Sequence, residues 1–164
     1  AVHKTDVCLI NGGTIRGNMI FDTGDLSKKT ITSMHPFGNK VVKIYASGKD
    51  IRDYIEESLK CYQDVCGNFV AVSGLKYTFD PSAPPGQRLK KLLHSSGSPV
   101  GDSETLTVAI TDYMLANSKM KNNKLYKMVT KNDAVPLVDS LFNAVKAAGQ
   151  QCIAPQVDGR IVKL

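Results

Sequence analysis

The sequence has no apolar run that approaches the roughly 20 residues a helix needs to cross a bilayer. Its first residues, Ala1 to Asp6, also lack the apolar centre of a signal peptide. No initiator methionine is present, and the first predicted strand begins almost at once. We therefore expect this chain to be a piece of a longer protein.

Cysteine and histidine are too few and too scattered to build a metal site. They occur at Cys8, Cys61, Cys66, Cys152, His3, His35 and His94. The spacing of Cys61 and Cys66 is not that of zinc ligands, and no second close pair exists. The two thiols either close a short disulfide, which would imply an oxidising compartment, or remain free. We predict no metal ion on this chain.

The basic residues form no patch suited to nucleic acid. The formal net charge is +6, but the lysines and arginines are spread along the chain. The densest group, Lys119, Lys121 and Lys124, has no interleaved aromatic residues of the kind that stack on bases. We therefore expect no nucleic acid partner. The charge is compatible with a phosphorylated small molecule instead.

The composition is that of one soluble domain over residues 1–164, with 42% hydrophobic and 22% charged residues. Runs rich in β-branched or aromatic residues, bounded by turn formers, predict seven strands. These are Asp6 to Ile10, Val41 to Ala46, Phe69 to Val72, Lys76 to Phe79, Arg88 to Leu93, Thr105 to Ile110 and Gly159 to Lys163. Strands mixed with helices predict an α+β or mixed α/β pattern, and we expect an α+β fold with a mixed β-sheet and packed helices.

Two helices have clear periodicity. Ile51, Tyr54, Ile55 and Leu59 share one face at helical spacing. A second helix is predicted from Ala134 to Ala148, with Gly149 at the position of a C-terminal cap.

The most informative motif is the stretch from Asn11 to Arg16, Asn-Gly-Gly-Thr-Ile-Arg, directly after an apolar strand. Two glycines allow positive φ and close approach of the backbone to a ligand. The arginine supplies a planar fork of donors suited to phosphate or carboxylate. By itself the motif also fits a plain turn with a solvated arginine.

Three further segments invite a chemical interpretation. Asp22-Thr23-Gly24 has the tripeptide of an aspartic protease, but that chemistry needs two carboxylates and the chain has one such tripeptide, so a turn is favoured. Phe37, between Pro36 and Gly38, either presents a flat face to a base or packs in the core. Tyr113 follows a predicted strand, where ligand contacts collect, or packs inward on a short helix.

The order and spacing of these segments carry a family resemblance that runs through nearly all 164 residues. Its elements are Cys-Leu-Ile-Asn-Gly-Gly-Thr-Ile-Arg (8–16), Gly-Asp-Leu (24–26), Pro-Phe-Gly-Asn (36–39), Ser-Gly-Lys-Asp-Ile (47–51), Val-Ser-Gly-Leu-Lys-Tyr-Thr-Phe-Asp (72–80), Pro-Gly-Gln-Arg (85–88), Thr-Asp-Tyr (111–113) and Asp-Gly-Arg-Ile (158–161). Together they resemble the C-terminal domain of the 5′-nucleotidase family, which includes ecto-5′-nucleotidase and bacterial UDP-sugar hydrolase. The Gly-Asp-Leu context also argues against the protease.

The resemblance implies a division of labour between two domains. In that family a separate N-terminal metallophosphoesterase domain holds two divalent metal ions, such as zinc, and the C-terminal domain binds the nucleotide. This chain would be the substrate-binding part of a secreted, cell-surface or periplasmic hydrolase of nucleoside monophosphates such as AMP. By itself it would be inactive and would hold no catalytic residue. A homodimer is left open.

The resemblance also assigns site residues. Arg16 matches an arginine that contacts the phosphate, Asn11 and Asn39 match asparagines that hydrogen-bond the nucleoside, and Phe37 matches one of two aromatics that sandwich the base. Gly12 and Gly13 complete the substrate-binding turn. Tyr113 is the expected second aromatic, although an alignment through the residues that follow would place Met114 there.

The chain departs from the family pattern after this second aromatic. The family usually has Gly-Gly-Asp-Gly there, with an aspartate that binds the ribose hydroxyls, whereas Asn117 to Met120 read Asn-Ser-Lys-Met. The carboxylate therefore has no evident equivalent. This departure leaves open a second function, a noncatalytic nucleotide-binding or host-interaction protein on the same scaffold.

Overall fold

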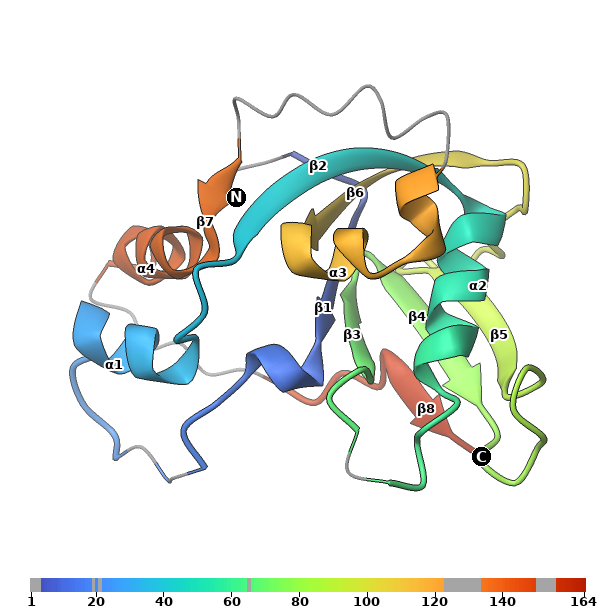
Figure 1. Ribbon diagram of the computed structural model, residues 1–164, viewed down its shortest axis with the longest axis horizontal. Helices are drawn as coiled ribbons and strands as arrows, with labels where there is room; N and C mark the ends of the chain where they lie inside the picture. Colours follow the sequence, from blue (N-terminus) through green and yellow to red (C-terminus); the bar gives the residue numbers. More distant parts are fainter. Residues whose placement is uncertain (1–3, 19, 21, 65, 123–133, 150–155) are drawn as a thin grey trace.

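The computed structural model describes residues 4–18, 20, 22–64, 66–122, 134–149 and 156–164. Its main element is a five-stranded mixed sheet with the strand order β3-β1-β6-β2-β7 (Figure 1). These strands are β1 (Val7–Asn11), β2 (Lys40–Ser47), β3 (Val70–Ser73), β6 (Thr105–Thr111) and β7 (Val135–Pro136). The strands β1 and β6 run parallel, and every other neighbouring pair in this sheet is antiparallel.

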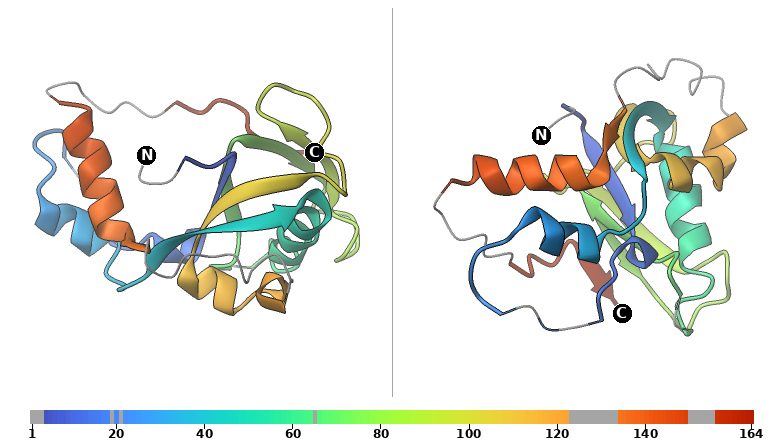
Figure 2. Two further views of the ribbon diagram at one scale, coloured as in Figure 1. Left: turned by 90° about the horizontal axis from the view of Figure 1, so that it is seen from above. Right: turned by 60° about the vertical axis from the view of Figure 1, so that its left-hand side comes forward.

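A second, smaller sheet has the order β5-β4-β8. Its strands are β4 (Leu75–Phe79), β5 (Leu89–His94) and β8 (Ile161–Lys163). Helix α2 (Gly48–Ser58) lies beside it at one end of the molecule in both Figure 1 and Figure 2. Its predicted inner residues Ile51, Ile55 and Leu59 are fully buried, as their helical spacing requires. They join apolar residues of both sheets in one core.

Helix α2 starts directly after β2 because Ser47 and Asp50 form a capping box. The Ser47 hydroxyl accepts a bond from the Asp50 N–H at 3.1 Å, and Asp50 Oδ2 accepts one from the Ser47 N–H at 2.9 Å. Gly48 is required at the first helical position, since a Cβ there would lie 2.1 Å from the Gly101 carbonyl oxygen.

Two more helices lie together at the opposite end of the molecule (Figures 1 and 2). They are α1 (Lys28–Met34) and α4 (Leu137–Ala147), and Lys28 pairs with Asp139 at 2.8 Å. Two short elements, η1 (Gly12–Thr14) and η2 (Lys119–Asn122), and helix α3 (Asp112–Ala116) complete the described structure.

Most of the predicted elements are confirmed, and the α+β fold with a mixed sheet is confirmed with them. All seven predicted strands exist within two residues of their expected bounds, and Gly149 has the positive φ of +65° expected of a helix cap. The second long helix starts three residues later than predicted, because Val135 precedes a proline and is held extended in β7.

Helix α1 was not predicted, and α3 is the short helix that was the alternative interpretation of the segment around Tyr113. Both are short, and α1 contains the β-branched Thr30, Ile31 and Thr32, whose helix propensity is low. Ser27 and Thr111 start the two helices by accepting bonds from backbone N–H groups. Such short helices depend on tertiary contacts that local periodicity does not reveal.

Arg88 is 2% exposed, although the sequence predicted it at the start of a strand. Its guanidinium donates to the carbonyl oxygens of Leu59, Lys60 and Ala83 and to Gln63 Oε1, so it caps the end of α2.

The Cys61–Cys66 disulfide, one of the two alternatives left open by the sequence, closes the loop that follows α2. In the described part of the chain, no helix is long and apolar enough to cross a membrane.

Candidate functional site

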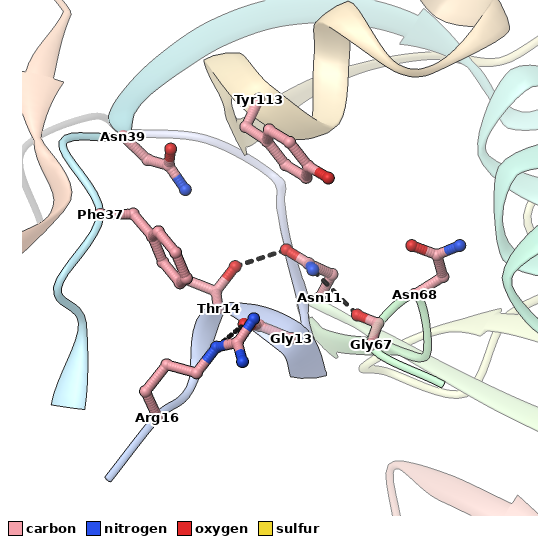
Figure 3. A pocket seen from close by; sticks show the side chains of 9 residues that line it. All are labelled: Asn11, Gly13, Thr14, Arg16, Phe37, Asn39, Gly67, Asn68 and Tyr113. Carbon is pink, nitrogen blue, oxygen red and sulfur yellow. Dashed lines mark hydrogen bonds between the residues drawn. The ribbon is translucent and has the colours of Figure 1, made fainter. Parts of the chain in front are cut away.

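A pocket of about 210 Å³ lies at one edge of the five-stranded sheet. It is lined by Asn11, Gly13, Thr14, Arg16, Phe37, Asn39, Gly67, Asn68 and Tyr113. Figure 3 shows their side chains around one hollow, with Phe37 and Asn39 on one side and Asn68 on the other.

The strand directions explain why these distant segments meet. Because β1 and β6 are parallel, their C-terminal ends share an edge, which brings Asn11 near the start of α3. The antiparallel partners β2 and β3 begin at this same edge, with Val41 opposite Thr111 and Val70 opposite Asn11. The residues before β2 and β3 therefore reach the pocket as well. A further bond, from the Lys40 N–H to Asp112 Oδ1 at 3.0 Å, ties the start of β2 to α3.

The glycine turn after β1 is bound to the loop before β3. The N–H of Gly12 donates to the Phe69 carbonyl and that of Gly13 to the Gly67 carbonyl, both at 2.8 Å. A Cβ on Gly13 would lie 3.0 Å from Gly67. The turn thus needs glycine for close packing rather than for positive φ, which neither glycine adopts. Both N–H groups are already bonded, so side chains provide most of the polar contacts left for a ligand.

Asn11 is 7% exposed and holds this turn together. Its Nδ2 donates to the Gly67 carbonyl at 2.9 Å, and its Oδ1 accepts a bond from the buried Thr14 hydroxyl (Figure 3). An asparagine carboxamide has two N–H donors and two acceptor lone pairs. One donor and one acceptor position of Asn11 therefore remain for a ligand.

Arg16 is the only one of the nine lining residues with a formal charge. Its Nε donates to the Gly13 carbonyl at 2.9 Å, and the guanidinium carbon lies 5.1 Å from the centroid of the Phe37 ring. The guanidinium therefore has a fixed place beside an aromatic face, with its terminal nitrogens available to an anion.

Tyr113 is the aromatic residue that faces the pocket from α3. It is 54% exposed, whereas the neighbouring Met114 is 2% exposed and packs in the core. Phe37 is also substantially exposed, at 41%, so it is not the core residue that its sequence alternatively allowed. The pocket thus has two accessible aromatic rings from separate elements.

Two ionisable groups that interact with residues of the pocket have shifted pKa values. Desolvation lowers the pKa of His35 below its ordinary value, although a hydrogen bond to the Thr14 backbone opposes the shift, and its buried Nδ1 has no partner in the described structure. Burial, with a smaller effect from Tyr113, raises the pKa of Tyr54 to about 12. Both groups are therefore neutral at pH 7.

The structure brings together six of the seven residues predicted to bind substrate: Asn11, Gly13, Arg16, Phe37, Asn39 and Tyr113. Gly12 belongs to the same turn but does not line the pocket. Sequence reasoning missed Thr14, Gly67 and Asn68. The position of Thr14 three residues after Asn11 was a usable signal, whereas Gly67 and Asn68 carry no local signal.

The segment from Asn117 to Met120, whose sequence departs from the family pattern, does not line this pocket. It lines a second cavity of about 500 Å³ with the exposed side of α2, including Asp53, Tyr54 and Glu57. Asp53 and Glu57 are paired with Lys49 and Lys60 at 2.6 and 2.7 Å. Within the described residues, no group of three or more histidine, cysteine, aspartate or glutamate side chains is arranged to hold a metal ion.

The fold and the pocket define a class of protein, an α+β domain whose sheet edge carries a pocket lined by two exposed aromatic rings and one guanidinium. A sequence model of the 5′-nucleotidase C-terminal domain matches residues 1–132. The chain belongs to this family, as its resemblance indicated.

Individual relatives agree with this assignment. The trifunctional nucleotide phosphoesterase of Bacillus subtilis is 28% identical over 163 residues, and human 5′-nucleotidase is 25% identical over 171. The crystal structure of the 5′-nucleotidase precursor from Thermus thermophilus superposes with a TM-score of 0.87 at 25% identity. These matches cover 94%, 97% and 98% of this chain but only 11%, 29% and 32% of the respective relatives. The chain is thus similar to one part of much longer proteins.

Proposed function

We propose that this chain is the substrate-binding domain of a metal-dependent 5′-nucleotidase that hydrolyses nucleoside monophosphates such as AMP. The observation that supports this most directly is the meeting of Phe37, Tyr113 and Arg16 in one pocket. Two aromatic faces suit a purine base, and a guanidinium with free terminal nitrogens suits its phosphate. Carboxamides of Asn11, Asn39 and Asn68 are near enough to line the same hollow and to bond polar edges of the nucleoside.

The catalytic groups would lie on an N-terminal metallophosphoesterase domain. Two divalent metal ions there would polarise the phosphoryl oxygens and lower the pKa of a bound water. The pocket volume of about 210 Å³ lies below the usual range for a complete ligand site, roughly 300–1,000 Å³. This agrees with a site whose phosphate end is completed by a second domain. We expect the whole protein to be secreted, periplasmic or on the cell surface, because structural disulfides such as Cys61–Cys66 form and persist mainly in oxidising compartments.

Amide NMR spectra of the labelled chain provide the test. Adding AMP to millimolar concentration should shift the signals of Asn11, Arg16 and Phe37, while inorganic phosphate at the same concentration should affect mainly Arg16. An unchanged spectrum with AMP, from a chain whose signals are dispersed as in a folded protein, would contradict the proposed binding site.

One observation favours a second candidate, a noncatalytic nucleotide-binding protein. None of the nine lining residues is a carboxylate, and the segment from Asn117 to Met120 faces the other cavity. The sequence upstream of this chain separates the two functions. Intact Asp-x-His and Gly-Asn-His-Asp or Gly-Asn-His-Glu metal motifs would support the nucleotidase, and their loss would leave only binding.

A further inference from the structure

Among the described residues, Phe37 lies outside the packed core, and its ring has a cation–π contact with Arg16. It lies in the connection between α1 and β2, outside any helix or strand. Its side chain belongs neither to the buried core nor to the partly buried residues packed against that core. An aromatic wall that is 41% exposed and lacks core packing needs another contact to keep a defined orientation.

Arg16 provides that contact and is itself held at two points. Its backbone N–H donates to the Met34 carbonyl at 2.8 Å, which joins the end of the glycine turn to the end of α1. Its Nε donates to the Gly13 carbonyl at 2.9 Å, which restricts the plane of the guanidinium. The guanidinium carbon then lies 5.1 Å from the Phe37 ring centroid, within the range of a cation–π contact.

We infer that Arg16 is a positioning residue for the nucleobase as well as a partner for the phosphate. Through the cation–π contact it holds the Phe37 ring in the orientation on which the base stacks. This inference rests on the proposed nucleotide site and adds to it a coupling between the two ends of the ligand. Its consequence is that Arg16 contributes to the binding of adenosine, which has no phosphate for a guanidinium to contact.

Adenosine and AMP titrations of the wild-type chain and of Arg16→Gln test this inference. Glutamine keeps a polar side chain but removes the cation. From the usual strength of an exposed cation–π contact, adenosine affinity should fall about two- to fivefold. AMP affinity should fall further, because the phosphate partner is lost too. Arg52→Gln is the matched control, since Arg52 on α2 pairs with Asp102 and does not line the pocket. It should leave both affinities unchanged.

A spectroscopic signature separates positioning from general damage to the fold. In Arg16→Gln without ligand, the ¹³C-labelled Phe37 ring signal, assigned with Phe37→Leu, should move toward the position of an unconstrained ring. The amide signals of Leu9 and Val72, in the paired strands β1 and β3, should stay in place.

The possible failures are distinguishable. If wild type binds adenosine and Arg16→Gln binds it equally well, while AMP binding is weakened, Arg16 contacts the phosphate only and the inference is wrong. If wild type binds neither ligand, the proposed function fails, and this inference fails with it.

Discussion

Asn11 illustrates how one residue can serve both the fold and the site. Its carboxamide connects β1 to residues far along the chain, through Gly67, and within its own turn, through Thr14. It is nearly buried, so these bonds are shielded from competing water. The resemblance assigned Asn11 to the nucleoside, and the structure adds a structural role that precedes any binding.

Replacing Asn11 with alanine should therefore lower stability even without ligand. The substitution removes both side-chain bonds and leaves the buried Thr14 hydroxyl without its acceptor, at a cost of about 1–3 kcal/mol. Urea unfolding of wild type and Asn11→Ala measures this difference, with an unchanged m-value. Asn68→Ala is the control, because the exposed Asn68 side chain bonds no described residue and its loss should change stability by less than about 0.5 kcal/mol. Equal stability of both variants would show that the Asn11 bonds contribute nothing net.

Among the elements, the loop between α2 and β3 matters most for the pocket. It carries the disulfide, receives the N–H bonds of the glycine turn and contributes Gly67 and Asn68 to the lining. Tyr62 and Phe69 anchor it further, since both rings contact Phe79 at centroid distances of 4.7 and 6.0 Å. The pocket therefore depends on a loop that the sequence marks only by its two cysteines.

Removing the disulfide should destabilise this loop and the turn that is bound to it. For so short a closed segment, with a sequence separation of 5, the chain-entropy estimate is about 2 kcal/mol. The double variant Cys61→Ser with Cys66→Ser should unfold at a lower urea concentration, and the amide signals of Gly12 and Gly13 should shift. Cys8→Ser, at the free cysteine of β1, is the comparison and should change neither. An unaltered urea midpoint in the double variant would mean that hydrogen bonds and ring contacts hold the loop in place without the disulfide.

On the scale of the whole molecule, the pocket supplies polar and aromatic side chains but no acidic or imidazole group. Its lining contains one cation, two aromatic rings and three carboxamides, and no carboxylate or histidine. The chain also covers no more than a third of the length of the three relatives compared above. We expect the remaining chemistry to belong to another domain.

The purified chain should accordingly release no phosphate from AMP, with or without added zinc or manganese. A malachite green assay over hours, with a complete 5′-nucleotidase as the positive control, measures this. Turnover that resists a chelator and disappears in Asp22→Asn would contradict the proposal, since it would indicate carboxylate chemistry at the rejected Asp-Thr-Gly segment.

The sequence by itself determined the family, seven of the eight described strands and the face of α2 that is buried, because these depend on motifs and on the periodicity of neighbouring residues. It also indicated Arg16, Phe37 and Asn39 as members of one site. The tertiary structure showed that Tyr113 lines the pocket and that Met114 is buried. The direction in which a five-residue helix faces is set by what packs against it, so the sequence left both residues open. It alone revealed the burial of Asn11 and the contribution of Gly67 and Asn68. Those features depend on bonds between residues 56 apart, which the antiparallel pairing of β1 with β3 creates and no local pattern records.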